Sequence, residues 1–235
     1  MYQIKKRFFV LMYCCAFLAV VVICQIGSNT VTVMTQSAPI ENRTVIIIDA
    51  GHGGVDGGAT SCTGILESHT NLQIALKLND LMHLLGYETK MIRTTDTSIY
   101  TEGNTIAAQK VSDLKNRVKI INETENALLI SIHQNTFPDG KYHGAQVFYT
   151  KEPISQAMAK EMQSALVLSL NPGSNRQAKP ANGVYLMEHI EKPGILIECG
   201  FISNPEEAVK LNDPVYQNKL CCVIGTVISR HYTNT

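Results

Sequence analysis

Four side chains that could bind a metal or move a proton lie at the ends of apolar segments or just beyond them. His52 follows the apolar segment VIIIDAG, and His133 ends the segment LLISIH. Glu198 ends a third apolar segment, ILIE, and Glu67 opens a helical pattern downstream of His52. In open α/β sheets, ligands bind outside the carboxyl ends of the strands. We therefore expect these four residues to meet at one edge of a sheet.

The set of His52, Glu67 and His133 is typical of a catalytic zinc site. Two imidazoles and one carboxylate occupy three positions around the ion and leave the fourth for water. Glu198 then remains to accept the proton of the water and to return it to the leaving amine of a hydrolysed amide. The residue types also allow the reverse assignment, with Glu198 as the ligand and Glu67 as the base. Both assignments predict metal-assisted hydrolysis.

The segments that must position these residues alternate between strand and helix patterns. This alternation predicts an α/β fold with a mixed, mostly parallel sheet of about six strands and helices on both faces. The segments 93–109 and 171–182 have the composition of loops. The predicted strands are 44–50, 87–92, 127–133, 145–150, 183–187 and 194–200, and the predicted helices are 67–85, 111–122, 153–170 and 214–232.

The N-terminal part of the chain differs from the rest in composition. Three basic residues at positions 5–7 precede an uncharged apolar run from Phe8 to Cys24, which is typical of a signal peptide or a membrane anchor. The polar stretch that follows suits a linker. The basic flank predicts that the N-terminus stays inside and that the body of the protein is exported. We predict a signal peptide or anchor at 1–27, a linker at 28–43 and a catalytic domain at 44–235.

The charge balance excludes one class of partner. The 235 residues carry 20 basic and 20 acidic side chains, and the part after residue 27 carries a net charge of −3. Nucleic acid is therefore not expected as a partner. A dinucleotide-binding domain is not expected either, because the G-x-G-x-x-G fingerprint requires a glycine where Asp56 stands.

The strings VIIIDAGHGGVDGGA, ISIHQN, GVYLM and KPGILIECGFISNP, together with Glu67, resemble the Amidase_3 family of zinc N-acetylmuramoyl-L-alanine amidases. The resemblance covers residues 44–233 and implies an amidase fold of the phosphorylase/hydrolase-like type. It implies hydrolysis of the bond between N-acetylmuramic acid and L-alanine in peptidoglycan. It also implies that His52, Glu67 and His133 bind Zn²⁺ and that Glu198 is the catalytic carboxylate.

Within this family, the resemblance is strongest to members from endospore-forming bacteria that act in germination. It implies removal of stem peptides from the spore cortex, the step before muramic-δ-lactam forms. Division-associated relatives carry a helical insertion that blocks the metal site, but here only Lys151 and Glu152 separate the strand 145–150 from the next helix. No wall-binding module is apparent in the sequence. We therefore expect that an exported partner, or the membrane segment, supplies activation or targeting.

Two other functions could use the same residues. A zinc carboxypeptidase acting on the stem peptide would use the same metal chemistry, and an exported zinc protein could bind wall polymer without cutting it. The released fragment distinguishes the amidase from the carboxypeptidase, and the presence of Glu198 argues against a binder without activity. Arg176 and Lys179, in the loop 171–182, are explained most simply as solvated charges.

Overall fold

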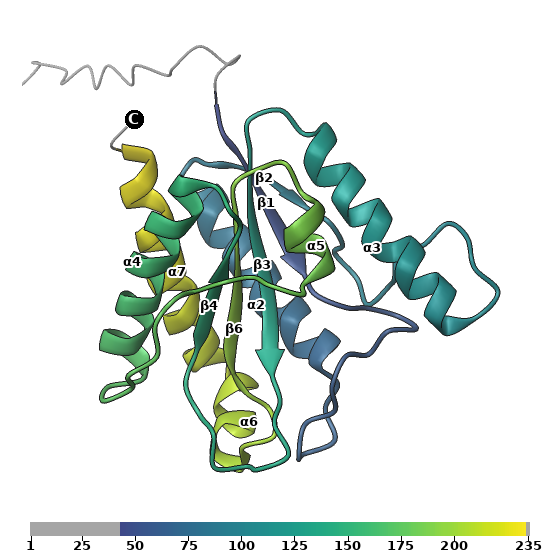
Figure 1. Ribbon diagram of the computed structural model, residues 1–235. Helices are drawn as coiled ribbons and strands as arrows, with labels where there is room; N and C mark the ends of the chain where they lie inside the picture. Colours follow the sequence, from purple (N-terminus) through teal and green to yellow (C-terminus); the bar gives the residue numbers. More distant parts are fainter. Residues whose placement is uncertain (1–42, 234–235) are drawn as a thin grey trace, which may run out of the picture. The chain divides into compact units, whose positions relative to one another are not determined.

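A six-stranded sheet forms the centre of the computed structural model, which describes residues 43–233 (Figure 1). The strand order is β2-β1-β3-β6-β4-β5. The first four of these strands are parallel, whereas β4 runs antiparallel to β6 and β5 runs parallel to β4. This confirms the prediction of a mixed, mostly parallel sheet of about six strands. The strands are β1 (Val45–Ala50), β2 (Glu88–Met91), β3 (Ala127–Asn135), β4 (Gln146–Tyr149), β5 (Lys179–Pro180) and β6 (Gly194–Phe201).

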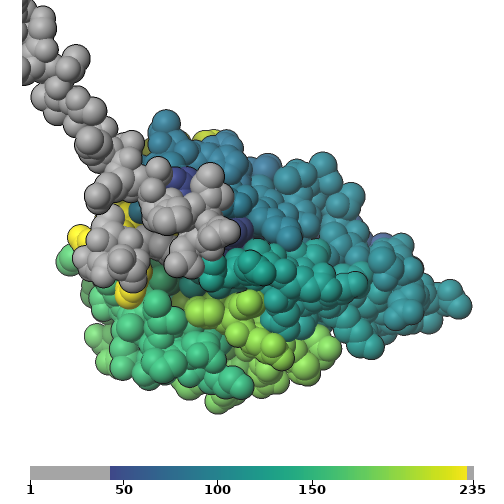
Figure 2. All heavy atoms as spheres, turned by 90° about the horizontal axis from the view of Figure 1, so that it is seen from above, coloured from purple at the N-terminus to yellow at the C-terminus, as the bar shows by residue number. Residues whose placement is uncertain are grey.

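Helices cover both faces of the sheet, as predicted. The helices α2, α4 and α7 pack on one face, and α3 and α5 pack on the other (Figure 1). Seen from above the view of Figure 1, the residues of α3 and of the loop before it project from one side of this domain (Figure 2). The helices are α2 (Glu67–Leu84), α3 (Ile106–Glu123), α4 (Pro153–Leu170), α5 (Tyr185–His189), α6 (Pro205–Leu211) and α7 (Pro214–Thr233).

The central strands are buried on both faces, which explains why their sequences are apolar without a break. In β1, Ile46 and Ile48 belong to the core on the side of α2, α4 and α7, whereas Ile47 belongs to the smaller core on the side of α3 and α5. All three side chains are fully buried. Parallel strands in this arrangement bring their carboxyl ends to one edge of the sheet, where the candidate site lies.

One predicted strand is wrong. The segment 183–187 (GVYLM) was expected to be a strand, but the structure has the short helix α5 from Tyr185 to His189. A short apolar run without polar alternation fits a buried strand and a buried helical turn equally well. The sixth strand is instead the two-residue β5, within the segment expected to be a loop.

Two helices also differ from the prediction at their N-termini. α3 begins at Ile106, five residues before the predicted start, because the Thr105 side chain caps it by accepting a hydrogen bond from the Ala108 amide at 3.2 Å. The helix α6 was not predicted. The sequence nevertheless contains its start signal, since Asn204 accepts hydrogen bonds from two amides of the first turn and Pro205 follows.

The predicted export segment at 1–27, and the predicted linker except for its last residue, lie outside the described residues. Between residues 43 and 233, no helix combines the length and the apolar character needed to cross a bilayer. The predicted domain boundaries therefore stay predictions.

Candidate metal centre and catalytic carboxylate

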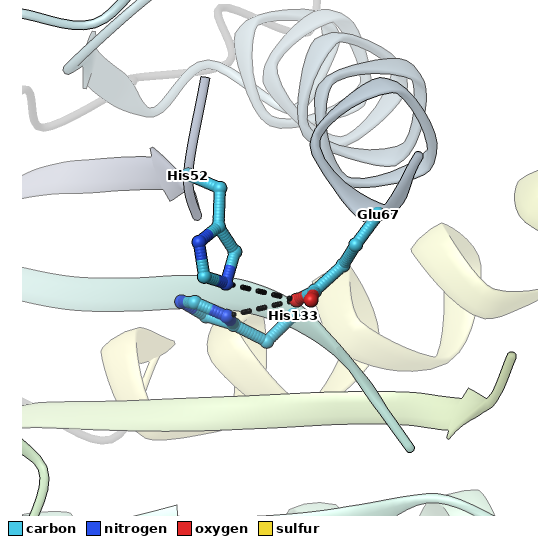
Figure 3. Close-up of side chains that lie close together, drawn as sticks. All are labelled: His52, Glu67 and His133. Atoms are coloured by element: carbon cyan, nitrogen blue, oxygen red, sulfur yellow. Dashed lines mark hydrogen bonds and ion pairs between the residues drawn. The ribbon is translucent and has the colours of Figure 1, made fainter. Parts of the chain in front are cut away.

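Three of the four candidate side chains come together at the carboxyl edge of the sheet. His52 lies two residues beyond β1, Glu67 is the first residue of α2, and His133 lies near the end of β3 (Figure 3). One potential ligand atom from each residue lies within 4.8 Å of the other two. The Oε1 atom of Glu67 is 3.3 Å from Nε2 of His52 and 3.1 Å from Nδ1 of His133. The two imidazoles and the carboxylate thus face one another across a small space.

Glycines make room for this cluster. A Cβ atom at Gly51 would lie 2.2 Å from the His133 ring, and one at Gly58 would lie 2.6 Å from Oε2 of Glu67. No larger residue could occupy either position without displacing a candidate ligand. His52 itself has a φ of 61°, in the left-handed region that residues with a side chain seldom adopt. The glycine-rich turn therefore has an unusual backbone path that directs His52 toward Glu67 and His133.

Asp56 holds the far side of the His52 ring. Its Oδ2 lies 2.8 Å from Nδ1 of His52, and its Oδ1 lies 2.7 Å from Nζ of Lys110 and 3.2 Å from the Gly58 amide. Burial opposes the charge on His52, but hydrogen bonds to Asp56 and Glu67 outweigh burial and raise the pKa of His52 to about 9. Burial alone would raise the pKa of Asp56, but its hydrogen bonds to His52 and Lys110 hold it well below the usual range.

Glu67 is buried and its carboxylate is fixed in direction. Oε2 accepts a hydrogen bond from the Ala59 amide at 3.0 Å, and Oε1 accepts one from the Gln134 amide at 3.1 Å. Burial would raise the pKa of Glu67, but hydrogen bonds to His133 and His52 lower it far below its ordinary value. Glu67 is therefore ionised, which is the form required of a metal ligand.

Two buried arginines hold the backbone of the turn that carries His52. Arg117 donates to the carbonyl of His52 at 2.8 Å and to that of Ala50 at 3.1 Å. Arg93 donates to the carbonyl of Ala50 at 2.8 Å and, through one terminal nitrogen, to those of Gly51 and Ser68 at 3.0 and 2.9 Å. The two side chains thus connect the residues next to both His52 and Glu67.

The charge of Arg117 is balanced by two carboxylates. Arg117 pairs with Asp49, which also accepts a hydrogen bond from the Ser131 hydroxyl, and with Asp113 at 2.6 Å. Burial would lower the pKa of Arg117, but these carboxylates raise it above its ordinary value. The arginine therefore stays charged under the site.

Glu198 stands apart from the three-residue cluster. It lies on β6 opposite His133 of β3 in the strand register. Its Oε2 is buried and makes no hydrogen bond within the described part of the chain. Burial raises the pKa of Glu198 to about 7, and the charge of Glu67 contributes to the rise. The geometry therefore favours Glu67 over Glu198 as the carboxylate of a metal site, and it leaves Glu198 close to the balance between its two protonation states.

Sequence reasoning did not identify Asp56, Arg93 or Arg117 as site residues. In the sequence, Asp56 is a departure from the dinucleotide fingerprint. Its position four residues after His52, in a glycine-rich turn, is the feature that could have indicated a partner for the histidine ring. Arg117 lies 65 residues from its His52 partner, and nothing local in the sequence points to that contact.

The cluster fits a zinc ion. Two imidazoles and one carboxylate are a common catalytic zinc shell, and all three ligand atoms can point at one centre. Asp56 provides the hydrogen bond that a metal-ligating histidine usually makes through its other ring nitrogen. The described residues thus contain a possible metal site of two histidines and one glutamate.

Known proteins resemble the chain over most of its length. Residues 46–230 match the family described as N-acetylmuramoyl-L-alanine amidase. The germination-specific N-acetylmuramoyl-L-alanine amidase of Bacillus subtilis is 41% identical over 199 residues, which are 84% of this chain and 83% of that protein.

Solved structures of amidases are also similar to this chain. The CwlD amidase from Clostridioides difficile, in complex with the GerS lipoprotein, has a TM-score of 0.78 and 37% identity, covering 82% of this chain and all of that one. An N-acetylmuramoyl-L-alanine amidase from Clostridium difficile 630 has a TM-score of 0.69 and 30% identity, covering 82% of this chain and 98% of that one.

Proposed function

Because the chain belongs to the N-acetylmuramoyl-L-alanine amidase family, we propose that it is a zinc enzyme that hydrolyses the amide between N-acetylmuramic acid and the L-alanine of the stem peptide. The observation that carries the zinc assignment is the convergence of His52, Glu67 and His133 within 4.8 Å. A bound zinc ion would polarise the amide carbonyl and make water more acidic.

The protein's own residues perform the proton transfer in this proposal. Glu198 accepts the proton of the attacking water and later returns it to the amine of L-alanine, which leaves. In the metal-free protein, burial raises the pKa of Glu198 to about 7, in the range where a carboxylate can take up and release a proton near neutral pH. Asp56 keeps the Nε2 atom of His52 directed at the site by accepting a hydrogen bond from Nδ1, and Arg93 and Arg117 keep the turn in place.

We also propose that the enzyme acts outside the cytoplasm on spore cortex peptidoglycan. The germination-specific relative supports this role, which would remove stem peptides before muramic-δ-lactam forms. Residues 1–27 would direct export or anchor the protein in the membrane. An exported partner is supported by the similar CwlD structure, which is a complex with a lipoprotein.

The test is a product analysis with the full-length protein in detergent. The metal-free protein, with and without one equivalent of zinc, is incubated with cortex peptidoglycan, and released fragments are identified by mass spectrometry. The proposal expects peptides with a free L-alanine amino terminus, only when zinc is present. Release of single amino acids from the far end of the stem would indicate a carboxypeptidase instead. Zinc binding without any released fragment, even with the partner added, would indicate a wall-binding protein.

A further inference from the structure

An open pocket of about 650 Å³ lies beside β4, between the loop that precedes this strand and the loop that follows α4. Three cationic side chains line it, those of Lys141, Arg176 and Lys179, and Gln146 forms part of its wall. No carboxylate is among the described residues of the lining. We call this feature the basic pocket. Its charge favours an anionic ligand.

The basic pocket adjoins the proposed catalytic carboxylate through Gln146. In the antiparallel register of β4 and β6, Gln146 stands directly opposite Glu198. Residues that face each other in this way place their side chains on the same side of the sheet, with Cβ atoms about 4.5–5.5 Å apart. One residue of the pocket wall is therefore the direct neighbour of Glu198 in the sheet.

The Gln146 side chain is fixed in the pocket wall. The residue is 2% exposed, and its amide nitrogen donates to the Gln177 carbonyl at 2.6 Å. The same nitrogen lies 3.2 Å from Oε1 of Gln163 on α4 and 3.3 Å from the Val147 carbonyl oxygen, so these contacts hold the side chain in place.

Arg176 is held in place rather than left free in solvent. Its Nε donates to the His143 carbonyl at 3.1 Å, and its guanidinium lies 4.8 Å from the centre of the Phe201 ring. The Ala145 amide anchors the same loop by donating to the Asn171 side chain at 3.1 Å. A side chain fixed in this way loses little further entropy when it binds a ligand.

Arg176 and Lys179 have no acidic partner in the part of the chain that the structure describes. Among residues 43–233, neither side chain forms an ion pair, whereas Lys141 pairs with Asp139 at 2.6 Å. The sequence suggested that Arg176 and Lys179 are solvated loop charges, but the structure holds the Arg176 guanidinium in a pocket wall, where it can meet an anionic ligand. An arginine can bind a carboxylate through two parallel hydrogen bonds.

The chemistry of the substrate identifies the ligand. On the sugar side of the scissile bond, the lactyl carboxyl group is part of the amide and carries no charge. On the peptide side, the acidic residues that follow L-alanine carry free carboxylates. We propose that the basic pocket binds a free carboxylate of the stem peptide, with Arg176 as its main contact and Lys179 as a second positive charge. This inference rests on the amidase function proposed above.

The test compares muramoyl tripeptides with full-length, zinc-loaded protein in detergent. One substrate has free carboxylates on its second and third residues, and two others carry an amide at one of these positions. For the wild-type enzyme, amidation of the recognised carboxylate should raise KM by about tenfold, with little change in kcat. A tenfold change is at the lower end of the loss in affinity expected when a hydrogen bond to a charged group is removed. Arg176→Gln should raise KM for the substrate with free carboxylates by the same factor. Amidation of the recognised carboxylate should then cause no further change in the KM of this variant. Arg176→Lys should restore part of the affinity.

Two further variants separate recognition from structure. Lys179→Gln should raise KM by a smaller factor than Arg176→Gln, and its exposed side chain makes no hydrogen bond within residues 43–233 that could disturb the fold. Lys151→Gln removes a positive charge beyond the other end of β4 and should leave KM unchanged. Equal losses on free and amidated substrates in both Arg176→Gln and Lys179→Gln would overturn the proposal, as would a wild-type enzyme indifferent to amidation at both positions.

Direct binding distinguishes failure of this inference from failure of the amidase proposal. Calorimetry with the free tripeptide measures the pocket without any hydrolysis. Binding that requires a free carboxylate and is lost in Arg176→Gln supports the pocket even if no substrate is cut. Hydrolysis without carboxylate dependence would leave the amidase function intact and refute the pocket.

Discussion

Two carboxylates in this site have opposite environments, and their environments assign them different roles. Hydrogen bonds from the two imidazoles of His133 and His52 outweigh the burial of Glu67 and hold its pKa far below the ordinary value. Glu198 has a buried oxygen without a partner in the described chain, so burial raises its pKa to about 7. Carboxylates whose pKa values are pushed apart in this way commonly serve as a permanent anion and a proton carrier.

Replacing each residue should therefore produce a distinct phenotype. His133→Ala should lose zinc and activity together, because it opens the proposed coordination shell. Glu198→Gln should keep zinc and its fold but lose turnover by a factor of about 10²–10⁴, the usual contribution of a positioned proton carrier. Zinc stoichiometry and stem-peptide release, measured side by side, check this. If Glu198→Gln loses zinc and Glu67→Gln keeps it, the roles of the two carboxylates are reversed.

Zinc affinity should depend on pH through His52. In the metal-free protein, its pKa of about 9 keeps His52 protonated at neutral pH, so zinc must displace that proton. The affinity should rise by about tenfold per pH unit between pH 7 and 9 and then level off, since one proton is released per ion bound. Calorimetric titrations in buffers of different ionisation enthalpy measure the released proton. An affinity that is constant across this range would show that His52 is not protonated or is not a ligand.

Asp56 should set the strength of zinc binding. Asp56→Asn weakens the acceptor for Nδ1 of His52, and such a change in the partner of a ligand histidine typically lowers metal affinity by about 10–100-fold. Competition with a chromophoric chelator measures the affinity. Asp80→Asn, an exposed change on α2, is the matched control and should bind zinc like the wild type. Equal affinities in the two variants would remove Asp56 from the metal site.

The sequence pointed to the candidate metal ligands and proton carrier, but not to the residues that contact the backbone beside them. His52, His133 and Glu198 stand at strand ends that a parallel sheet must bring to one edge, and the family match confirms the resemblance carried by their motifs. Their assigned roles remain predictions. Arg93 and Arg117 act through contacts with backbone carbonyls, and such contacts depend on the path of the turn. No periodicity or composition encodes that path.

At the scale of elements, long periodic segments were predictable and short ones were not. The helix 153–170 was predicted with the bounds that α4 has, because its apolar positions repeat over many turns. The segment 183–187 is shorter than two helical turns, and its burial against the smaller core, rather than its pattern, makes Tyr185–His189 helical. The same reasoning explains why α6, seven residues long, was missed.

The link between α3 and β1 should be a major contribution to stability. Arg117 of α3 pairs with the buried Asp49 of β1, so Arg117→Leu leaves a carboxylate buried without its partner. The free energy of unfolding should fall by about 3–5 kcal/mol, as for other broken buried pairs. Urea unfolding of the metal-free protein measures it. The double variant with Asp49→Asn should recover part of the loss, and a double variant as unstable as the sum of the single changes would contradict a direct coupling.

At the scale of the whole molecule, all four proposed site residues and both cores lie within residues 43–233. None of the proposed site residues lies in the first 40 residues. The apolar run from Phe8 to Cys24 carries the hydrophobic character expected of an export signal, and the remainder has a net charge of −3. These features predict that targeting belongs to one part of the chain and catalysis to the other.

Residues 40–235 should therefore form a soluble domain that binds one zinc ion. Removing the N-terminal segment takes away no core residue of the described sheet, so the thermal unfolding of the shortened protein should remain cooperative. Its activity on a soluble muramoyl peptide should match that of the full-length protein in detergent, while its activity on intact cortex should be lower if the segment or an exported partner supplies targeting. Comparing the two proteins on both substrates measures this separation. An insoluble or non-cooperative shortened protein, beside an active full-length one, would show that the domain begins before residue 40.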